Sequence, residues 1–283
     1  MEGNIRYSNS NHSTCIRKKN GVTYLTFPLL EREGLVCGFT TRLGGVSKGD
    51  CAAMNLSFTR GDKETDVREN YCLMGEVLGI DLNDAVLSHQ VHKTEIHIVT
   101  EEDKGRGIRP GKERLFEIDG LMTDNKGIPL ITFFADCVPL IFYDPVKRVI
   151  ATSHSGWRGT VEKIGAKTIA MMESEMGCKR EDILAVVGPS ICQNCYEVSE
   201  DVALAFERVF SREQYEQMII DKKNGKYQLD LWKANEFILL DAGVKGEHLA
   251  VTDLCTCCNP EFLFSHRASH GKRGNLSVIL CLI

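Results

Sequence analysis

Two apolar runs decide the fold: Ile131-Thr-Phe-Phe-Ala-Asp136-Cys137-Val-Pro-Leu-Ile-Phe-Tyr-Asp144 and, shortly after it, Val149-Ile-Ala-Thr-Ser-His154-Ser-Gly-Trp157-Arg158-Gly159. Each run is too short to cross a bilayer, and both are typical of strands buried on both faces. Asp136, Cys137 and His154 are costly to bury in such places unless they bind a ligand or pair with one another. The Gly-Trp-Arg-Gly sequence indicates the start of a helix, so its free N–H groups and Arg158 predict a place for an anion.

A third polar side chain of the same kind lies upstream, at His92, after a predicted strand over residues 84–88. Catalytic zinc usually takes three protein ligands and leaves a fourth position open. The wide sequence separation of His92, Cys137 and His154 excludes a compact zinc finger and favours a site assembled by the tertiary fold. From the residues alone, a lone buried cysteine such as Cys137 is more often a packing residue than a ligand, and both interpretations stay open.

The composition is that of an ordinary globular protein, with 43% hydrophobic and 26% charged residues in 283. The net charge of −5 argues against a general nucleic-acid surface, which would be basic. No apolar run is long enough for a membrane span, and residues 1–20 lack the pattern of a signal peptide, so we expect a cytoplasmic protein and no membrane partner. Twelve cysteines in so long a chain predict mainly reduced thiols.

Predicted strands and helices alternate irregularly, which indicates an α+β fold with a mixed sheet. We find no repeat and no linker, and expect a single domain over residues 1–283 with a polar N-terminal extension over residues 1–20. A charged loop over residues 101–114 is predicted to be exposed and mobile. The predicted helices cover residues 65–80, 161–172, 199–210 and 231–242. Besides the two runs, the predicted strands cover residues 22–27, 35–40, 84–88, 94–99, 183–187, 248–251, 262–264 and 277–282.

Six motifs occur in an order that resembles the multicopper polyphenol oxidoreductase (laccase-domain) family of the purine nucleoside phosphorylase type. The Ala-Asp-Cys and His-Ser-Gly-Trp-Arg-Gly motifs are the most specific of them. The motifs are Thr41-Arg-Leu-Gly-Gly-Val-Ser47, Gln90-Val-His92, Ala135-Asp-Cys-Val-Pro139, His154-Ser-Gly-Trp-Arg-Gly159, Gly188-Pro-Ser-Ile191, and Cys255-Thr256 through Ser265-His-Arg267.

The resemblance implies a four-layer α/β/β/α sandwich and a zinc ion held by His92, Cys137 and His154. It also implies phosphorolysis of adenosine, inosine and methylthioadenosine, together with deamination of adenosine. The expected partners are therefore purine nucleosides and phosphate, and we expect a monomer or a homodimer. Zinc lowers the pKa of a bound water toward roughly 7, which suits attack on C6 of adenine.

Phosphorolysis also needs cations for phosphate, and Arg42, Arg158 and Arg267 are the candidates, Arg158 first. Asp136 is a candidate acid–base or ligand-orienting group, although a buried structural role explains it equally well. The family commonly has a paired Arg and a Thr-Gly-Arg sequence near the C-terminus. Here Arg267 is followed by Ala268, and Lys272-Arg273-Gly274 has the reversed order, so the sequence does not favour phosphate binding by Arg273.

Three other functions stay open. A copper-dependent polyphenol oxidoreductase would need clustered His-x-His pairs, which a chain with 8 histidines and no such pair does not offer, although Cu²⁺ at His92, Cys137 and His154 is possible. A cysteine hydrolase would use Cys137 as nucleophile and His154 as base. The third is a binding or regulatory protein with a residual metal site.

The remaining cysteines form two C-x-x-C pairs, Cys192/Cys195 and Cys255/Cys258, with Cys257 inside the second. Four thiolates are typical of structural zinc. Because 59 residues lie between Cys195 and Cys255, we interpret these thiols mainly as buried or redox-labile.

Overall fold

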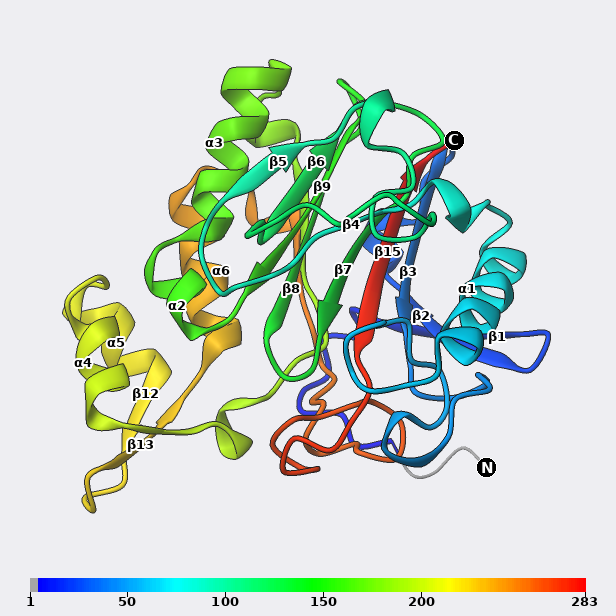
Figure 1. Ribbon diagram of the computed structural model, residues 1–283. Helices are drawn as coiled ribbons and strands as arrows, with labels where there is room; N and C mark the ends of the chain where they lie inside the picture. Colours follow the sequence, from blue (N-terminus) through cyan, green and yellow to red (C-terminus); the bar gives the residue numbers. More distant parts are fainter. Residues whose placement is uncertain (1–4) are drawn as a thin grey trace.

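The computed structural model describes residues 5–283 as two facing β-sheets with helices on both outer sides (Figure 1). Both sheets contain parallel and antiparallel pairs, so both are mixed. The first sheet, in spatial order, consists of β1 (Cys15–Lys19), β2 (Val22–Thr26), β3 (Leu35–Thr40), β15 (Leu276–Leu282), β7 (Leu130–Phe134) and β4 (Val86–Leu87). The second consists of β14 (Leu249–Val251), β10 (Leu184–Val187), β8 (Val138–Asp144), β9 (Val149–Ser155), β6 (Gly120–Thr123) and β5 (Ile96–Ile98).

An apolar core fills the space between the sheets. Phe39, Phe134 and Val278 enter it from the first sheet, and Ile141 and Ile150 enter it from the second. Each of these side chains is at most 2% exposed, and burial of such a side chain stabilises the fold by roughly 1.5–3 kcal/mol. The strands of the two apolar runs are buried, as predicted, but the first run contains two strands, β7 and β8, which lie in different sheets, while the second run contains the single strand β9.

Helices form the two outer layers (Figure 1). Helix α1 (Glu64–Leu78) covers the first sheet with Val67, Tyr71 and Met74, and it ends at Gly79, which has the left-handed conformation that glycine adopts easily. Helices α2 (Trp157–Val161), α3 (Ile164–Met176) and α6 (Leu231–Asp241) cover the second sheet. The predicted α+β fold with α/β/β/α layers is confirmed.

A small lobe projects from the second sheet, and the sequence patterns did not predict its sheet. The lobe consists of β11 (Glu197–Ser199), β12 (Ile219–Asp221) and β13 (Lys226–Leu229) with α4 (Glu200–Glu207) and α5 (Arg212–Met218). Short 3₁₀ turns complete the fold: η1 (Pro28–Leu30), η2 (Gly49–Cys51), η3 (Leu82–Asp84), η4 (Glu101–Asp103), η5 (Arg180–Asp182), η6 (Gln193–Cys195) and η7 (Gly246–His248). No helix within residues 5–283 is long and apolar enough to cross a membrane.

Several local expectations differ from the structure. Residues 262–264 are a turn and not a strand, because their apolar side chains are buried in the core between the sheets without strand pairing. The loop over residues 101–114 is only partly exposed, since Asp103 and Ile108 are buried. Residues 15–19 of the expected N-terminal extension form β1, which pairs with β2 along its whole length.

Candidate active site

Two connections cross from the first sheet to the second and meet beside β9. The turn at residues 135–137 joins β7 to β8 and carries Cys137, while the connection from β4 to β5 carries His92. His154 lies on β9, opposite Pro139 of β8. The ligand atoms of His92, Cys137 and His154 all lie within 4.8 Å of one another, and the two imidazole rings are 4.6 Å apart between centroids. The fold therefore brings together the three residues that the sequence singled out.

The backbone at this meeting point is tightly constrained. His92 and Asp136 both have left-handed conformations, with φ of 62° and 84°, which residues other than glycine adopt infrequently. Gly156 lies directly against the side chains of His92 and Cys137. A Cβ atom at Gly156 would lie 2.8 Å from Nδ1 of His92 and 3.2 Å from Sγ of Cys137. The glycine of the Gly-Trp-Arg-Gly motif is thus needed to make room for the imidazole and the thiol.

A buried carboxylate, Asp119, holds two of the three residues in place. Its Oδ1 atom accepts hydrogen bonds from Nδ1 of His154 at 2.8 Å and from the backbone N–H of His92 at 3.0 Å. Its Oδ2 atom accepts from the N–H groups of Val91 and Lys93. Because Nδ1 of His154 is engaged, Nε2 is the atom left to face Cys137. Asp119 lies just before β6 in an Ile-Asp-Gly sequence, and no pattern in the sequence marked it as a site residue.

The electrostatics of the site favour an ion pair between Cys137 and His154. Burial alone would raise the pKa of Cys137, but the charge of His154 and hydrogen bonds with both histidines lower this pKa to about 6. Burial would lower the pKa of His154, yet the Cys137 thiolate and Asp119 raise it to about 9. Burial would also raise the pKa of Asp119, and the hydrogen bond and charge of His154 keep it below its usual value. The thiol is therefore prepared to act as a thiolate ligand or nucleophile at neutral pH.

The donor set suits a divalent metal ion. Two imidazoles and one thiolate are ligands of zinc and of copper, and three ligands leave one position open. The carboxylate of Asp119 contacts Nδ1 of His154, and a carboxylate in this position commonly orients a metal-bound histidine. Cysteine and histidine groups that could hold a metal are thus present, and their chemistry fits the predicted ion.

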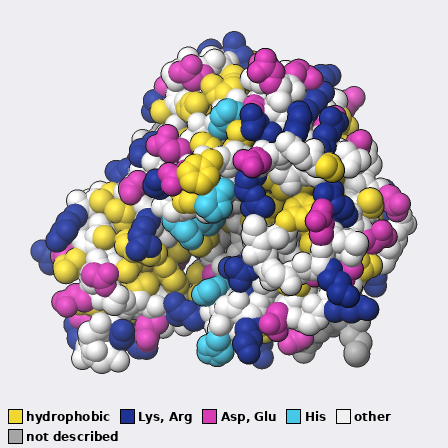
Figure 2. Space-filling view, in the orientation of Figure 1, with side chains coloured by type: hydrophobic (Ala, Val, Ile, Leu, Met, Phe, Trp, Pro, Cys, Tyr) yellow, Lys and Arg dark blue, Asp and Glu magenta, His cyan; other side chains and the backbone are white. Residues whose placement is uncertain are grey.

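A cavity of about 230 Å³ opens beside Cys137 and His154. Three half-buried arginines, Arg60, Arg114 and Arg273, line it. None of these guanidinium groups forms an ion pair within the described part of the chain. Burial and the charge of Arg60 lower the pKa of Arg273 to about 10, and its buried Nε has no hydrogen-bond partner among the residues that the structure describes. Figure 2 shows histidine and basic side chains along the hollow in the middle of this face.

The arginines nominated from the sequence lie elsewhere, and none of the three is a lining residue of this cavity. Arg42 donates to the carbonyl groups of Ala52 and Pro260 and so braces a loop. Arg158 is exposed and stacks on Trp157, with its guanidinium carbon 4.3 Å from the ring centroid. Arg267 donates to two backbone carbonyls at the start of the small lobe. Phosphate binding by these arginines stays a prediction.

Both carboxylate oxygens of Asp136 accept hydrogen bonds from residues that do not line the cavity. One oxygen of Asp136 accepts from the hydroxyl group of Thr256 and the other from the backbone N–H of Arg267, both at 2.6 Å. Its carboxylate therefore fixes the turn before Cys137 to the C-terminal segment. An acid–base or ligand-orienting role for Asp136 stays a prediction.

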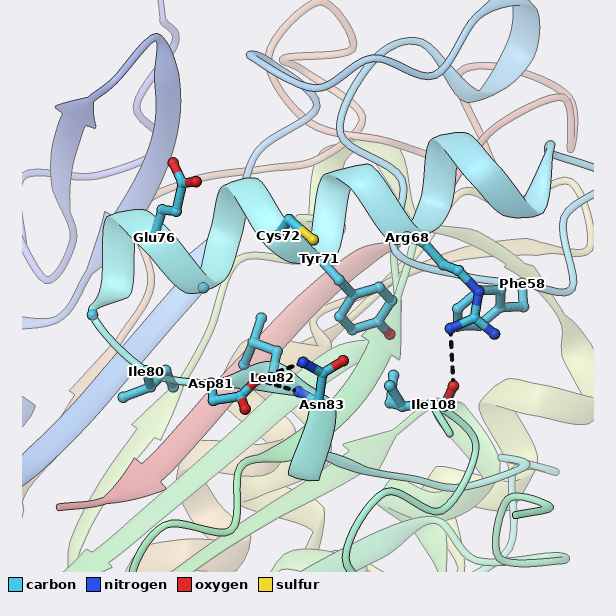
Figure 3. A pocket seen from close by; sticks show the side chains of 12 residues that line it. Phe58, Arg68, Tyr71, Cys72, Glu76, Ile80, Asp81, Leu82, Asn83 and Ile108 are labelled. Atoms are coloured by element: carbon cyan, nitrogen blue, oxygen red, sulfur yellow. Dashed lines mark hydrogen bonds between the residues drawn. The ribbon is translucent and has the colours of Figure 1, made fainter. Parts of the chain in front are cut away.

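A larger cavity, of about 620 Å³, lies over α1 and away from these residues (Figure 3). Its lining includes Tyr71, Cys72 and Arg68, but Arg68 is already paired with Glu64 and donates to the carbonyl of Ile108. No group of metal-ligating side chains was found in it among residues 5–283. Volume alone therefore does not locate the active site.

Comparison with known families agrees with this geometry. Residues 36–283 match the family described as multi-copper polyphenol oxidoreductase laccase. The chain belongs to this family. The resemblance found from the motifs is confirmed, and the match contains all of the candidate site residues.

Relatives in this laccase family carry enzyme names. Purine nucleoside phosphorylase YlmD of Bacillus subtilis (strain 168) is 36% identical over 247 residues, which are 86% of each chain. Adenosine deaminase RL5, from an unknown prokaryotic organism, is 32% identical over 236 residues, or 83% of this chain and 89% of its own. The crystal structure of YlmD from Geobacillus stearothermophilus has a TM-score of 0.88 at 32% identity and covers 95% of this chain and 99% of its own.

Proposed function

We propose that the chain is a zinc-dependent purine nucleoside phosphorylase that also deaminates adenosine. It would convert adenosine, inosine or methylthioadenosine and phosphate into the free base and ribose 1-phosphate. The relatives with phosphorylase and deaminase names support this reaction class. The observation that carries the proposal is that one cavity contains the candidate metal ligands and three arginines that have no acidic partner among residues 5–283. The single domain over residues 1–283, the cytoplasmic location and a monomeric or dimeric state stay predictions.

His92, Cys137 and His154 would hold the zinc ion. When bound there, zinc supplies Lewis acidity and lowers the pKa of water at its open position. Asp119 keeps Nδ1 of His154 engaged and so directs Nε2 to the ligand position. Cu²⁺ is the alternative ion for the same donors, but the absence of any His-x-His pair in the full sequence excludes the usual pattern of a four-copper centre.

Arg60, Arg114 and Arg273 would hold phosphate. Charge-assisted hydrogen bonds from guanidinium groups are strong and match the geometry of phosphate oxygens. An anion in the cavity would also offset the repulsion between Arg60 and Arg273 that lowers the pKa of Arg273. Held beside C1′ of the nucleoside, the phosphate oxygen forms the new bond to C1′ as the bond from C1′ to the purine nitrogen breaks.

The purine would lie towards an exposed aromatic pair at the rim. The Phe116 side chain is 75% exposed and stacks on the ring of His89, with 5.7 Å between centroids. His89 and Arg114 line both the cavity at Cys137 and a neighbouring cavity of about 520 Å³. Because the inner cavity is smaller than the roughly 300–1,000 Å³ of pockets that enclose a whole ligand, a nucleoside would extend from it towards Phe116.

A thiol hydrolase is the second candidate, and one observation favours it. The site has the arrangement that activates a catalytic thiol, in which a carboxylate (Asp119) holds an imidazole (His154) and the imidazole faces a thiol (Cys137). In that case the metal-free protein would retain full activity, and a reactive substrate analogue would alkylate Cys137 in it. Loss of activity on metal removal, restored by zinc, would exclude it.

A nucleoside panel assayed with and without phosphate tests the proposal. Purified protein should release hypoxanthine from inosine only with phosphate present, and should convert adenosine to inosine without it. The His92→Ala variant should lose both reactions. Absence of base release with phosphate and zinc would contradict the phosphorylase assignment, and oxygen uptake with a phenol would favour copper chemistry.

A further inference from the structure

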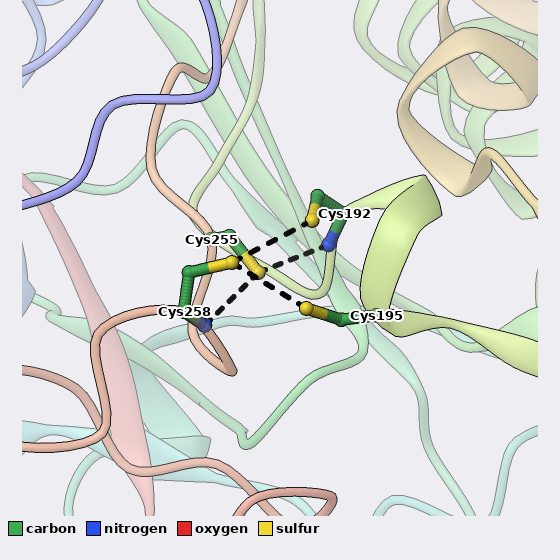
Figure 4. Close-up of side chains that lie close together, drawn as sticks. All are labelled: Cys192, Cys195, Cys255 and Cys258. Carbon is green, nitrogen blue, oxygen red and sulfur yellow. Dashed lines mark hydrogen bonds between the residues drawn. The ribbon is translucent and has the colours of Figure 1, made fainter.

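Four thiols converge at a second place in the molecule, outside the cavity at His154. Cys192, Cys195, Cys255 and Cys258 belong to the two C-x-x-C pairs that lie far apart in sequence. Their four Sγ atoms all lie within 4.8 Å of one another. Figure 4 shows the side chains pointing toward a common centre from two separate loops. The fold therefore brings together two cysteine pairs whose long separation in the sequence made a shared site unexpected.

The spacing of the sulfur atoms matches a single metal ion. A tetrahedral site with Zn–S bonds of about 2.3 Å has sulfur atoms about 3.8 Å apart. The Sγ atom of Cys258 is 3.4 Å from that of Cys195 and 4.0 Å from that of Cys192. All four are free thiols in the structure. Clusters of two or four iron atoms need more widely separated thiolates than these.

The main sheet positions the two loops. Strands β10 and β14 pair in parallel, and the pairing continues past their ends through a bridge between Ser190 and Cys255. The N–H of Thr256 donates to the carbonyl of Ser190 at 3.1 Å. Each C-x-x-C pair thus begins within two residues of the same bridge, so their convergence follows from the register of buried strands.

Backbone donors at the cluster suit a charged sulfur. The N–H groups of Cys192 and Cys258 donate to Sγ of Cys255 at 3.2 and 3.4 Å. Hydrogen bonds to an ionised acceptor are stronger than those to a neutral one, so these two donors would support the sulfur of a metal-bound Cys255, which has no exposed surface. Cys37 and Cys281, by contrast, do not belong to any group of potential metal ligands found in the described residues.

We propose that Cys192, Cys195, Cys255 and Cys258 bind a structural zinc ion. Because all four positions would be filled by thiolates, the ion would have no open position and would take no part in the reaction. This inference rests on the geometry of the four cysteines and does not depend on the proposed phosphorylase activity.

The zinc would connect the small lobe and the C-terminal segment to the active site. The cluster lies beside residues that fix the turn before Cys137: the N–H of Ile191 donates to the backbone carbonyl of Asp136, and the hydroxyl of Thr256 donates to its carboxylate. Arg267 donates to the carbonyl of Cys195. Binding would therefore stabilise the folded protein and hold the Asp136 turn in place.

Metal analysis of the intact protein tests this. Wild type purified with excess zinc and then dialysed should hold two zinc ions per chain, and Cys137→Ala should hold one. X-ray absorption on Cys137→Ala should show four sulfur atoms around the remaining ion. This measurement leaves the four cysteines of the cluster unchanged, so it does not depend on whether a cluster variant folds. Cys192→Ser and Cys258→Ser should each lower the zinc content by one relative to wild type. The matched controls Cys257→Ser, in the same loop, and Cys72→Ser, on α1, should keep two.

Three results would overturn the proposal. The first is a single zinc per wild-type chain that is lost in Cys137→Ala. The second is nitrogen ligation of the zinc that remains in that variant. The third is a titration in denaturant and chelator that finds eight thiols instead of the 12 in the sequence, since that would mean two disulfides. Failure of the nucleoside assay would leave all of these measurements unaffected.

Discussion

The Nδ1 atom of His154 lies 2.8 Å from Oδ1 of Asp119, a carboxylate with no exposed surface. The same carboxylate accepts hydrogen bonds from three consecutive backbone N–H groups in the segment that carries His92. One side chain therefore sets both the orientation of His154 and the position of His92. This shared support makes Asp119 the residue on which the geometry of the metal ligands most depends.

Replacement of Asp119 by Asn should weaken zinc binding at the active site by about 10–100-fold, the usual effect of losing a carboxylate behind a histidine ligand. The amide nitrogen cannot accept the N–H bonds that the carboxylate now accepts. Competition with a chromophoric chelator measures the affinity. Asp124→Asn, at an exposed carboxylate near the end of β6, is the control and should bind zinc like wild type. Equal affinities in both variants would contradict this role.

Alkylation of Cys137 in metal-free protein should depend on pH with a midpoint near 6. Because the pKa of this thiol is lowered to about 6, the thiolate forms as the pH rises through that value and is lost below it. At pH 7 about 90% of Cys137 would be thiolate, against about 1% of a thiol with a pKa of 9. Mass spectrometry of the alkylated peptide follows the reaction.

The His154→Ala variant is the matched test of the cause. Without the imidazolium the midpoint should move upward, because its charge and hydrogen bond lower the pKa of Cys137. Zinc should protect the wild-type thiol at every pH. An unchanged midpoint in His154→Ala would contradict the proposed ion pair.

Gly156→Ala should remove zinc from the active site while the protein stays folded. The added methyl group would lie 2.8 Å from Nδ1 of His92, so the imidazole has to move away. The φ angle at residue 156 is −72°, which alanine adopts easily, so backbone strain is not the cause. Metal content and thermal unfolding measure the two effects. Gly246→Ala is the control, because a Cβ there would meet no described atom within 4 Å. Full zinc content in Gly156→Ala would contradict the predicted clash with His92.

Arg273→Gln should raise the KM for phosphate by roughly 10–100-fold, since a hydrogen bond to a charged group contributes about 1.5–3 kcal/mol. Arg114→Gln should act in the same direction. The KM for inosine at saturating phosphate should change less. Arg212→Gln, at a residue whose side chain is 91% exposed on α5, is the control. If Arg158→Gln raises this KM and Arg273→Gln does not, the arginine chosen from the sequence is the phosphate ligand.

The sequence predicted the layers well because buried strands and amphipathic helices leave local patterns. The run from Ile131 to Asp144 is apolar because both of its strands lie in the core. Phe262–Phe264 misled the same reasoning, since apolar side chains are buried in turns as well as in strands. The lobe with β12 and β13 was missed because its strands are short and its surface is largely exposed.

The site was predictable only in part, for a physical reason. His92, Cys137 and His154 are polar residues at the ends of apolar runs, and that contrast is visible in a sequence. Asp119 acts through four hydrogen bonds that form only after the sheets assemble, and Arg60 and Arg273 become neighbours only through tertiary contacts. The four-cysteine cluster depends in the same way on the pairing of β10 with β14.

Incubation of the zinc-loaded wild type with inosine and ¹⁸O-labelled phosphate is the most direct test of the central claim. Labelled ribose 1-phosphate should form in an amount equal to that of hypoxanthine. Free ribose, or no release of base, would contradict it.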